Sequence, residues 1–255
     1  MKLNLFIVAV ALFILPRTLR AEDWGTLSGR IVFTGVVNKP EKVQVTRDED
    51  VCGVLPLVDE SLIVNPKNKG LQNVVIWLSS KATVPVHPDF SKPPKPAKLD
   101  NKDCRFVPHI VQLRTQQPLD CTSTDTISHN VAVWARRNNP FSEVIPKGSP
   151  LTKVFEREEL QPIRVDCSIH AWMRSYLIIT EHPYSAVTDK DGNFQIPKLP
   201  FGEWQFRFWH ERVGLLPAIT VDGEERELKR GVWEMQIDTA EITLPKLSIS
   251  ELTDE

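Results

Sequence analysis

The sequence predicts a mostly β protein, and three observations support this prediction. After residue 21, short runs in which apolar and polar residues alternate recur along the chain, each bounded by Gly, Pro, Asn or Asp. The same region contains no long apolar pattern with a helical period. Seven tryptophans and eleven phenylalanines provide enough aromatic volume to fill the cores of β-sandwiches. A chain of 255 residues can form one large domain or two modest ones.

The first 21 residues have the layout of a signal peptide. Lys2 precedes eleven consecutive apolar residues, Leu5 to Leu15, and the segment ends at Ala21. A transmembrane helix needs about 20 apolar residues, so this shorter run is typical of the core of a signal peptide. We therefore expect an exported protein that begins near Glu22 and is periplasmic, secreted or located at the cell surface. An uncleaved membrane anchor is the alternative.

The mature chain carries a modest negative charge. The signal peptide contains three of the 31 basic residues and none of the 33 acidic ones, so 28 basic and 33 acidic residues remain and the net charge is −5. No basic cluster is dense enough to neutralise a run of phosphates, which argues against a nucleic-acid-binding protein. The acidic residues are scattered, as on an ordinary solvated surface.

The first part of the mature chain contains candidate strands followed by a proline-rich segment. The candidate strands are Leu27–Gly35, Lys42–Thr46, Ser61–Asn65 and Asn73–Ser80. Between Pro85 and Pro96 there are five prolines in twelve residues. Because proline lacks the backbone donor that a central strand needs, we expect a linker or surface loop here.

Two further β regions follow. The first has apolar strands on either side of a polar stretch from Arg136 to Glu159. In the second, Asp191 and Gly192 form a hairpin turn between two alternating strands, and Trp204, Phe206 and Phe208 then share one strand face. The predicted boundaries are 22–84 for the N-terminal β segment, 85–98 for the linker, 99–182 and 183–247 for the two later β regions and 248–255 for a tail.

The stretch VDCSIHAWMRSYLII, Val165 to Ile179, places three potential metal ligands close together. Cys167, His170 and Met173 follow one another at intervals of three, just before a run of strand-forming residues. A trigonal set of two His and one Cys with a weak axial Met is typical of blue-copper electron-transfer sites. The alternatives are a disulfide at Cys167, or ordinary core residues in a tight loop.

His129, in TISHNVAVW, is the best candidate for the second imidazole ligand. It begins an apolar alternating strand that would hold the ring rigidly, and Asn130 beside it can hydrogen-bond across to a neighbouring loop. Four histidines compete for this place. We expect His87, in the proline-rich segment, to be a solvated loop histidine and His109 and His210 to be structural, and His182 lies at a turn marked by a proline.

CSIHAWM resembles the ligand loop of the small blue copper proteins, the cupredoxins, and its C-x-x-H-x-x-M spacing is similar to that of the amicyanin type. In that family a His followed by Asn lies upstream on a strand, as in HNV at His129 to Val131. The resemblance covers roughly Asp103 to Glu181 and implies a Greek-key β-sandwich with one copper ion. The copper ligands that it implies are His129, Cys167, His170 and Met173. Ala171 stands where a Pro is common, and Trp172 is bulkier than its usual counterpart, so loop rigidity and reduction potential depart from the amicyanin pattern.

A second resemblance covers Ala186 to His210. AVTDKDGNFQIPKLPFGEWQFRFWHE is similar to the carboxypeptidase regulatory-like or transthyretin-like β-sandwich module, which is usually structural or adhesive. GRIVFTG, from Gly29 to Gly35, resembles an opening strand of such a module. We therefore expect the N- and C-terminal parts to pack together, with the copper-type domain between them. The whole layout resembles exported bacterial proteins labelled methylamine-utilisation proteins.

Four cysteines in an exported chain allow three disulfide connectivities. If Cys167 binds metal, three cysteines remain and one of them is unpaired. Cys52 and Cys104 lie at element edges, whereas Cys121 shares a strand face with Leu119 and suits a buried apolar role. We predict a Cys52–Cys104 disulfide that closes a loop of about 50 residues and stabilises the fold by about 3 to 4 kcal/mol. Cys104–Cys121 is the alternative pairing.

These observations predict an exported type 1 copper protein that binds one copper ion per chain and passes single electrons between redox partner proteins. No open coordination position is implied, and no hydrolase or nucleotide-binding motif is present, so we do not expect an enzyme. One alternative is a copper carrier or store with the same ligands. The other is a structural or carbohydrate-facing sandwich without metal. We expect neither a nucleic-acid partner nor an integral membrane segment in the mature chain.

Overall fold

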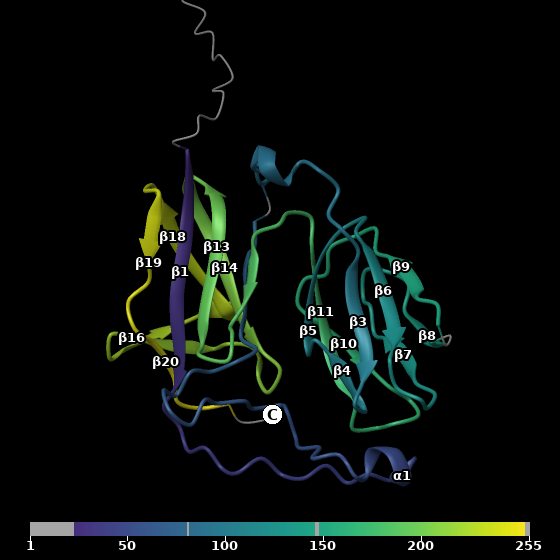
Figure 1. Ribbon diagram of the computed structural model, residues 1–255. Helices are drawn as coiled ribbons and strands as arrows, with labels where there is room; N and C mark the ends of the chain where they lie inside the picture. The colour runs from purple at the N-terminus through teal and green to yellow at the C-terminus, as the bar shows by residue number, and fades with distance from the viewer. Residues whose placement is uncertain (1–22, 81, 146–147, 253–255) are drawn as a thin grey trace, which may run out of the picture.

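Almost all of the regular secondary structure is β-strand, which confirms the predicted fold class (Figure 1). The computed structural model describes residues 23–80, 82–145 and 148–252, so the predicted signal peptide, residues 1–21, lies outside the described residues. Within these ranges the helical elements are α1 (Glu49–Cys52), η1 (Pro88–Phe90) and η2 (Lys229–Gly231). None of them is long and apolar enough to span a membrane.

The strands form four sheets. The first sheet contains β1 (Trp24–Phe33), β13 (Asn193–Pro200), β16 (Ala218–Val221), β17 (Glu224–Glu227), β19 (Glu241–Thr243) and β20 (Leu247–Ile249). The second contains β2 (Val75–Leu78), β12 (Ser185–Val187), β14 (Gly202–His210), β15 (Gly214–Leu215) and β18 (Val232–Ile237). The third contains β5 (Ile110–Arg114), β7 (Asn130–Val133), β8 (Phe141–Val144), β10 (Ile163–Asp166) and β11 (Arg174–Thr180). The fourth contains β3 (Ala97–Lys102), β4 (Arg105–Val107), β6 (Pro118–Ser123) and β9 (Leu151–Val154).

The four sheets stack face to face and enclose three apolar cores (Figure 1). The first core lies between the first and second sheets, and Phe206 and Phe208 of β14 are fully buried in it, on the predicted aromatic face. The second core lies between the third and fourth sheets. A smaller core, with Trp77, Tyr176 and Trp209 among its members, joins the second sheet to the third. The molecule is therefore two β-sandwiches packed against each other.

The strands at this junction are buried on both faces. Val75 and Trp77 of β2 point into the small core, whereas Ile76 and Leu78 point into the first core. β11 alternates in the same way between the small core and the second core. Because successive strand residues face opposite sides, a strand between two cores needs apolar residues at every position. This explains the continuous apolar runs in β2 and β11.

The first sandwich combines the two ends of the chain. β1 pairs with β13 and β20, and β2 pairs with β12 and β14. The segments predicted as 22–84 and 183–247 therefore share both sheets, and we propose that they form one module. β20 includes Ser248 and Ile249, which the sequence analysis assigned to the tail. β3 begins at Ala97, inside the predicted linker 85–98.

Two predicted strands are not strands. The segment 42–46 contains one isolated bridge, between Lys42 and Val58, and the segment 61–65 contains one, at Val64. Conversely, β8 and β9 lie in the polar stretch from Arg136 to Glu159, where the sequence analysis placed no strand. Both of these strands are half exposed and carry few apolar residues, which is why the alternation there is weak.

The predicted turn at Asp191 and Gly192 is present, but it is not a hairpin. The Gly192 amide donates to the Asp189 carbonyl at 2.9 Å, and Gly192 has a φ of 80°. A Cβ at Gly192 would lie 2.1 Å from the carbonyl oxygen of Ile31, so only glycine fits. The strands on either side, β12 and β13, belong to different sheets, so the turn carries the chain from one sheet of the sandwich to the other.

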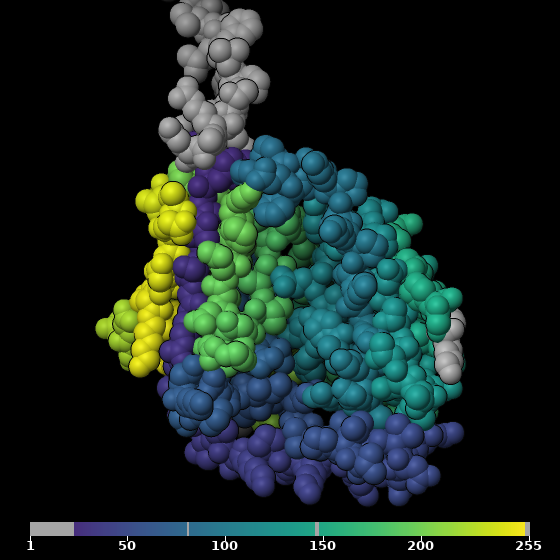
Figure 2. Space-filling view, in the orientation of Figure 1, coloured from purple at the N-terminus to yellow at the C-terminus, as the bar shows by residue number. Residues whose placement is uncertain are grey.

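The segment between β1 and β2 crosses from the first sandwich to the base of the second (Figures 1 and 2). α1 lies at the far end of this crossing, and a disulfide between Cys52 and Cys104 joins it to the turn between β3 and β4. Val43, Val45 and Leu57 pack around the disulfide in a small cluster of their own. Part of the N-terminal segment thus lies against the sandwich that carries the predicted ligands.

Candidate metal centre

Three of the four predicted ligands converge at one end of the second sandwich. His129 immediately precedes β7, and Cys167 and His170 lie in the loop between β10 and β11. A ligand atom from each of these three side chains lies within 4.8 Å of the other two. Nδ1 of His170 is 3.1 Å from Nδ1 of His129 and 3.7 Å from Sγ of Cys167. Both imidazoles are 0% exposed and the thiol residue is 2% exposed.

The strands on both sides of the ligand loop fix its shape. β10 and β11 are antiparallel, with Asp166 opposite Arg174, so Cys167 and Met173 form the neck of a hairpin loop. The Cys167 amide donates to the Met173 carbonyl at 3.3 Å, and the Met173 amide donates to the His170 carbonyl at 2.9 Å. Met173 itself is 1% exposed and packs in the second core. The loop therefore brings the backbones of Cys167 and Met173 together at its neck and folds His170 back toward Met173.

Asn130 ties the loop to β7, as the sequence analysis expects. Its Oδ1 accepts from the Ser168 amide at 2.6 Å, and its Nδ2 donates to the hydroxyls of Ser168 and Ser142 at 3.2 and 2.9 Å. Ser168 directly follows Cys167, so one amide side chain joins the two separated parts of the ligand set. This contact holds the thiol of Cys167 beside His129.

Two carboxylates contact the outer edges of the imidazoles. Oδ2 of Asp125 lies 2.8 Å from Nε2 of His129, and Oδ2 of Asp48 lies 2.8 Å from Nε2 of His170. A carboxylate accepts hydrogen bonds, so we assign the proton of each ring to Nε2, which leaves both Nδ1 lone pairs directed at the centre. Burial lowers the pKa of His129, although the Asp125 carboxylate opposes this, so its ring is neutral near pH 7.

With the ring protons at Nε2, the remaining donor atoms can be compared with what a metal ion needs. Two lone pairs 3.1 Å apart beside a thiol repel one another unless a cation or a shared proton lies between them. The donor set, two imidazoles and a thiol, is one that soft and borderline metal ions prefer. The residues present therefore fit a metal ion, and among the residues that the structure describes no other group of three His, Cys, Asp or Glu ligand atoms lies this close.

Sequence reasoning missed both carboxylates. Asp125 precedes His129 by four residues in DTISH, a local signal that could have drawn attention to it. Asp48 is 122 residues away from His170 and lies in the segment predicted as part of the N-terminal β region, so no local pattern points to it.

The disulfide joins the segment that carries Asp48 to the turn that Asp125 contacts. Cys52 pairs with Cys104, the favoured pairing, and Cys121 and Cys167 are free. Asp103 and Cys104 form a two-residue turn between β3 and β4 with positive φ at both positions, as type I′ turns require. Asp125 accepts hydrogen bonds from the amides of both turn residues at 2.7 and 2.9 Å. The ligand-loop residue Trp172 donates from Nε1 to the Cys104 carbonyl at 3.1 Å.

The remaining cysteine and histidines lie outside the centre. Burial raises the pKa of the Cys121 thiol to about 12, so this thiol stays protonated. The remaining histidines occur in structural roles: His87 accepts from the Asp89 amide at the start of η1, His109 pairs with Glu211 at 2.6 Å, and His182 and His210 are buried. The expectation that His87 is solvated is wrong, because its side chain is 19% exposed and its ring contacts Trp24.

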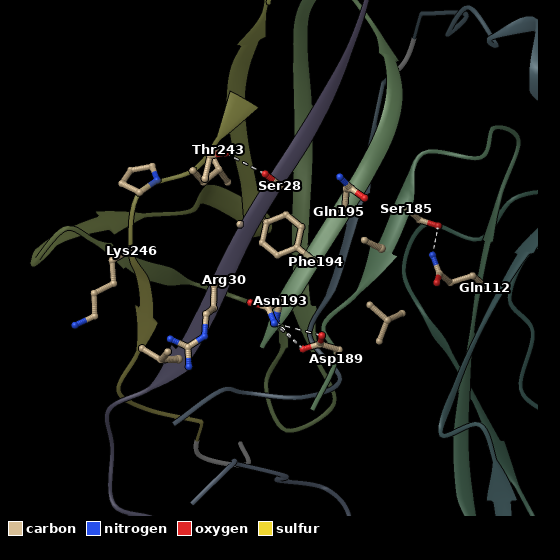
Figure 3. Close-up of a pocket in the computed structure, with 16 residues that line it drawn as sticks. Ser28, Arg30, Gln112, Ser185, Asp189, Asn193, Phe194, Gln195, Thr243 and Lys246 are labelled. Atoms are coloured by element: carbon tan, nitrogen blue, oxygen red, sulfur yellow. Dashed lines mark hydrogen bonds between the residues drawn. The ribbon is translucent and has the colours of Figure 1, made fainter. Parts of the chain in front are cut away.

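A groove of about 740 Å³ lies where the two sandwiches meet, away from the candidate metal centre (Figure 3). The amide of Gln112 donates to the Ser185 hydroxyl across it at 2.8 Å. Asn193 and Gln195 provide further polar groups, but Phe194 is only 5% exposed and offers no open aromatic face for a sugar ring. The groove therefore gives no support to the carbohydrate-facing alternative.

Comparisons with known proteins give partial structural likenesses. No family model and no curated protein sequence matches the chain. The copper-containing nitrite reductase from Thermus scotoductus is 17% identical with a TM-score of 0.32 over 38% of this chain, and the match spans only 27% of that enzyme. Amicyanin from Paracoccus versutus is 18% identical with a TM-score of 0.30 over 41% of this chain and 96% of its own. A purple cupredoxin from Nitrosopumilus maritimus is 18% identical with a TM-score of 0.28 over 32% of this chain and 98% of its own. Because these identities and scores are low, the functional argument rests on the geometry of the site.

Proposed function

We propose that the protein is a mononuclear type 1 copper protein that carries single electrons between redox partners. The observation that carries this proposal is the convergence of His129 Nδ1, Cys167 Sγ and His170 Nδ1 in a fully buried site. When bound, copper would supply one-electron redox chemistry through its thiolate bond. Met173, at the neck of the loop, would be a fourth and weaker ligand.

The chain's own residues prepare this site. Asp125 and Asp48 hold the ring protons at Nε2, so both Nδ1 atoms are available to a metal ion without prior loss of a proton. The apolar second core surrounds Cys167 and Met173 and keeps water away from the sulfur atoms. Strands on either side of the loop limit its movement, which suits a site whose geometry has to change little between two oxidation states.

Copper binding is tested by titration of the purified mature protein with Cu(II). We expect one ion per chain and an intense visible band from thiolate-to-copper charge transfer that reductant bleaches. Cys167→Ser should abolish the band and leave the far-ultraviolet circular dichroism unchanged, because the thiolate is the one ligand that produces the transition. Cys121→Ala is the matched control, since Cys121 lies outside the ligand group, and it should keep the band. A band that persists in Cys167→Ser would contradict the proposal.

One observation favours a copper carrier or store instead. Neither imidazole is exposed, so no ligand edge reaches the surface for direct contact with a redox partner. Two rates separate the functions: electron self-exchange of the copper form, followed by NMR line broadening, and metal transfer to a Cu(I) chelator. Fast self-exchange with slow metal transfer supports electron transfer, and the reverse supports a carrier. We propose that the protein acts outside the cytoplasm in either case, as the predicted signal peptide implies.

A further inference from the structure

One side of the candidate metal centre is covered by a segment from outside the ligand-bearing sandwich. We define this lid as residues Asp48–Leu57, which comprise the residue before α1, α1 itself and the turn that follows. Oδ2 of Asp48 lies 2.8 Å from Nε2 of His170, the ring atom that points away from the other ligands. His170 is fully buried, whereas 36% of the Asp48 side chain is exposed, so Asp48 lies between the imidazole and solvent.

The side chain of Asp48 contacts His170 and does not cap its own helix. Asp48 is the N-cap of α1, where an Asp side chain ordinarily accepts a hydrogen bond from the first turn, but it makes no such bond. Its backbone has φ 50° and ψ 44°, in the left-handed region, which Asp adopts more readily than most other non-glycine residues. With no bond to its own helix, the carboxylate is free to contact Nε2 of His170.

A covalent tether holds the lid in place. The Asp48 carbonyl accepts from the Cys52 amide at 2.8 Å, and Cys52 is bonded to Cys104. The same turn at Cys104 is fixed by Asp125, which also contacts His129. Because Cys52 and Cys104 are both 0% exposed, a dissolved reductant has no access to the bond in the folded protein. The disulfide is therefore suited to a permanent tether and unsuited to a redox switch.

We propose that the lid is part of the metal centre and that Asp48 is a positioning residue for His170. Its carboxylate keeps the proton of His170 on Nε2, with Nδ1 aimed at the metal, and its segment closes the route by which the metal leaves. This inference rests on the proposed metal function, but its structural half, the shielding of His170, applies to the metal-free protein as well.

Three variants separate this role from an ordinary structural one. Asp48→Gly removes the carboxylate while accepting the left-handed backbone, so a purely structural Asp48 would predict an unchanged or more stable protein. Asp48→Asn keeps an acceptor oxygen in nearly the same shape and should give a smaller effect than Asp48→Gly. Asp50→Asn is the matched control. It removes the same charge two positions away, at an exposed residue of α1.

The first measurement is the rate at which diethyl pyrocarbonate modifies His170 in the metal-free protein, read by peptide mass spectrometry. We expect at least a tenfold rise in Asp48→Gly, a smaller rise in Asp48→Asn and none in Asp50→Asn. An unchanged rate in Asp48→Gly would overturn the lid. Circular dichroism checks that each variant is folded. If Asp48→Gly does not fold, the modification rate of Asp48→Asn decides whether Asp48 shields His170.

The second measurement is the rate at which a chelator removes copper. Loss of a residue that orients a metal-binding histidine typically weakens metal affinity about 10- to 100-fold, so we expect faster removal of that order in Asp48→Gly. Equal removal rates in Asp48→Gly and Asp50→Asn would overturn the positioning role. If the wild-type protein binds no copper, the metal function fails by itself, and the His170 modification rates still decide whether the lid shields the ring.

Discussion

Met173 is the residue whose substitution most directly reports on the redox properties of the proposed site. A thioether favours Cu(I) over Cu(II), because the softer ion gains more from a soft donor. Met173→Gln supplies a harder oxygen donor and should lower the reduction potential, whereas Met173→Leu removes the donor and should raise it. Copper binding should survive both changes, because His129, Cys167 and His170 remain.

Voltammetry of the two Met173 variants provides the test. The competing role for Met173 is core packing, since it is 1% exposed in the second core. In that case Met173→Leu changes the free energy of unfolding by less than about 1.5 kcal/mol and leaves the potential where it was. If both variants keep the wild-type reduction potential, Met173 is not a copper ligand.

The state of the four cysteines is a second test at the scale of single residues. We expect the metal-free protein, unfolded without reductant, to contain two thiols, at Cys121 and Cys167, and one disulfide, between Cys52 and Cys104. A thiol that binds metal has to be free, so the count follows from the proposed function. Peptide mapping without reduction measures it. Discovery of Cys167 in a disulfide would favour the structural alternative.

How much of the site the sequence could predict depends on how local each contact is. Cys167, His170 and Met173 lie within one loop, so their spacing alone brings them together. His129 comes from a distant strand and was chosen through its Asn neighbour and the resemblance to cupredoxins. Neither spacing nor a family resemblance points to Asp48. Its contact with His170 exists because the segment between β1 and β2 crosses from the first sandwich to the second. Contacts of that type are set by tertiary packing and leave no local pattern.

At the scale of elements, alternation of apolar and polar residues predicted strands well where one face of the strand packs in a core and the other is more exposed. β14, with Phe206 and Phe208 on one face, is an example. The prediction failed at 42–46, where Val43 and Val45 alternate correctly but pack against the disulfide cluster and not into a sheet. An alternating pattern reports that one side of an extended segment is buried, and it does not report what buries it.

The tether between α1 and the β3–β4 turn gives a prediction at this scale. The Cys52–Cys104 disulfide has a sequence separation of 52, and in the chain-entropy model a loop of this size stabilises the folded state by about 4 kcal/mol. Replacement of both cysteines by serine should lower the free energy of unfolding by about 3 to 4 kcal/mol, measured by urea denaturation of the metal-free protein. A loss below about 1 kcal/mol would mean that the lid segment is held chiefly by its apolar contacts.

At the scale of the whole molecule, two buried histidines should make stability depend on pH. Burial lowers the pKa of His182 to about 4 and that of His210 to about 3, against an ordinary value of 6.5. Below pH 6.5 the unfolded chain binds protons that the folded protein does not, so stability falls as the pH drops from 6.5 toward 4. Between pH 7 and pH 5 each of these two histidines should lower the free energy of unfolding by about 2 kcal/mol.

A single variant isolates this effect from others in the same range. Burial disfavours the charged form of His109, but the Glu211 carboxylate outweighs it and raises the pKa, so His109 acts in the opposite direction. His182→Gln should therefore flatten the decline in unfolding free energy between pH 7 and pH 5, whereas His109→Gln should steepen it. Parallel curves for His182→Gln and wild type would refute the assignment.

The pairing of β2 with β12 has a consequence for protein engineering. The Leu78 amide donates to the Tyr184 carbonyl at 3.0 Å. The chain therefore leaves the first sandwich and re-enters it at neighbouring residues, with the second sandwich between them in sequence. The first sandwich is thus a host with a whole guest domain in one hairpin loop, and a different guest with adjacent termini could replace it without altering any strand pairing of the host. The host also carries Asp48, while the guest carries His129, Cys167 and His170. Transfer of this guest to another host would keep its three ligands and remove Asp48, so the rate of copper loss from that chimera would report what the host contributes to the site.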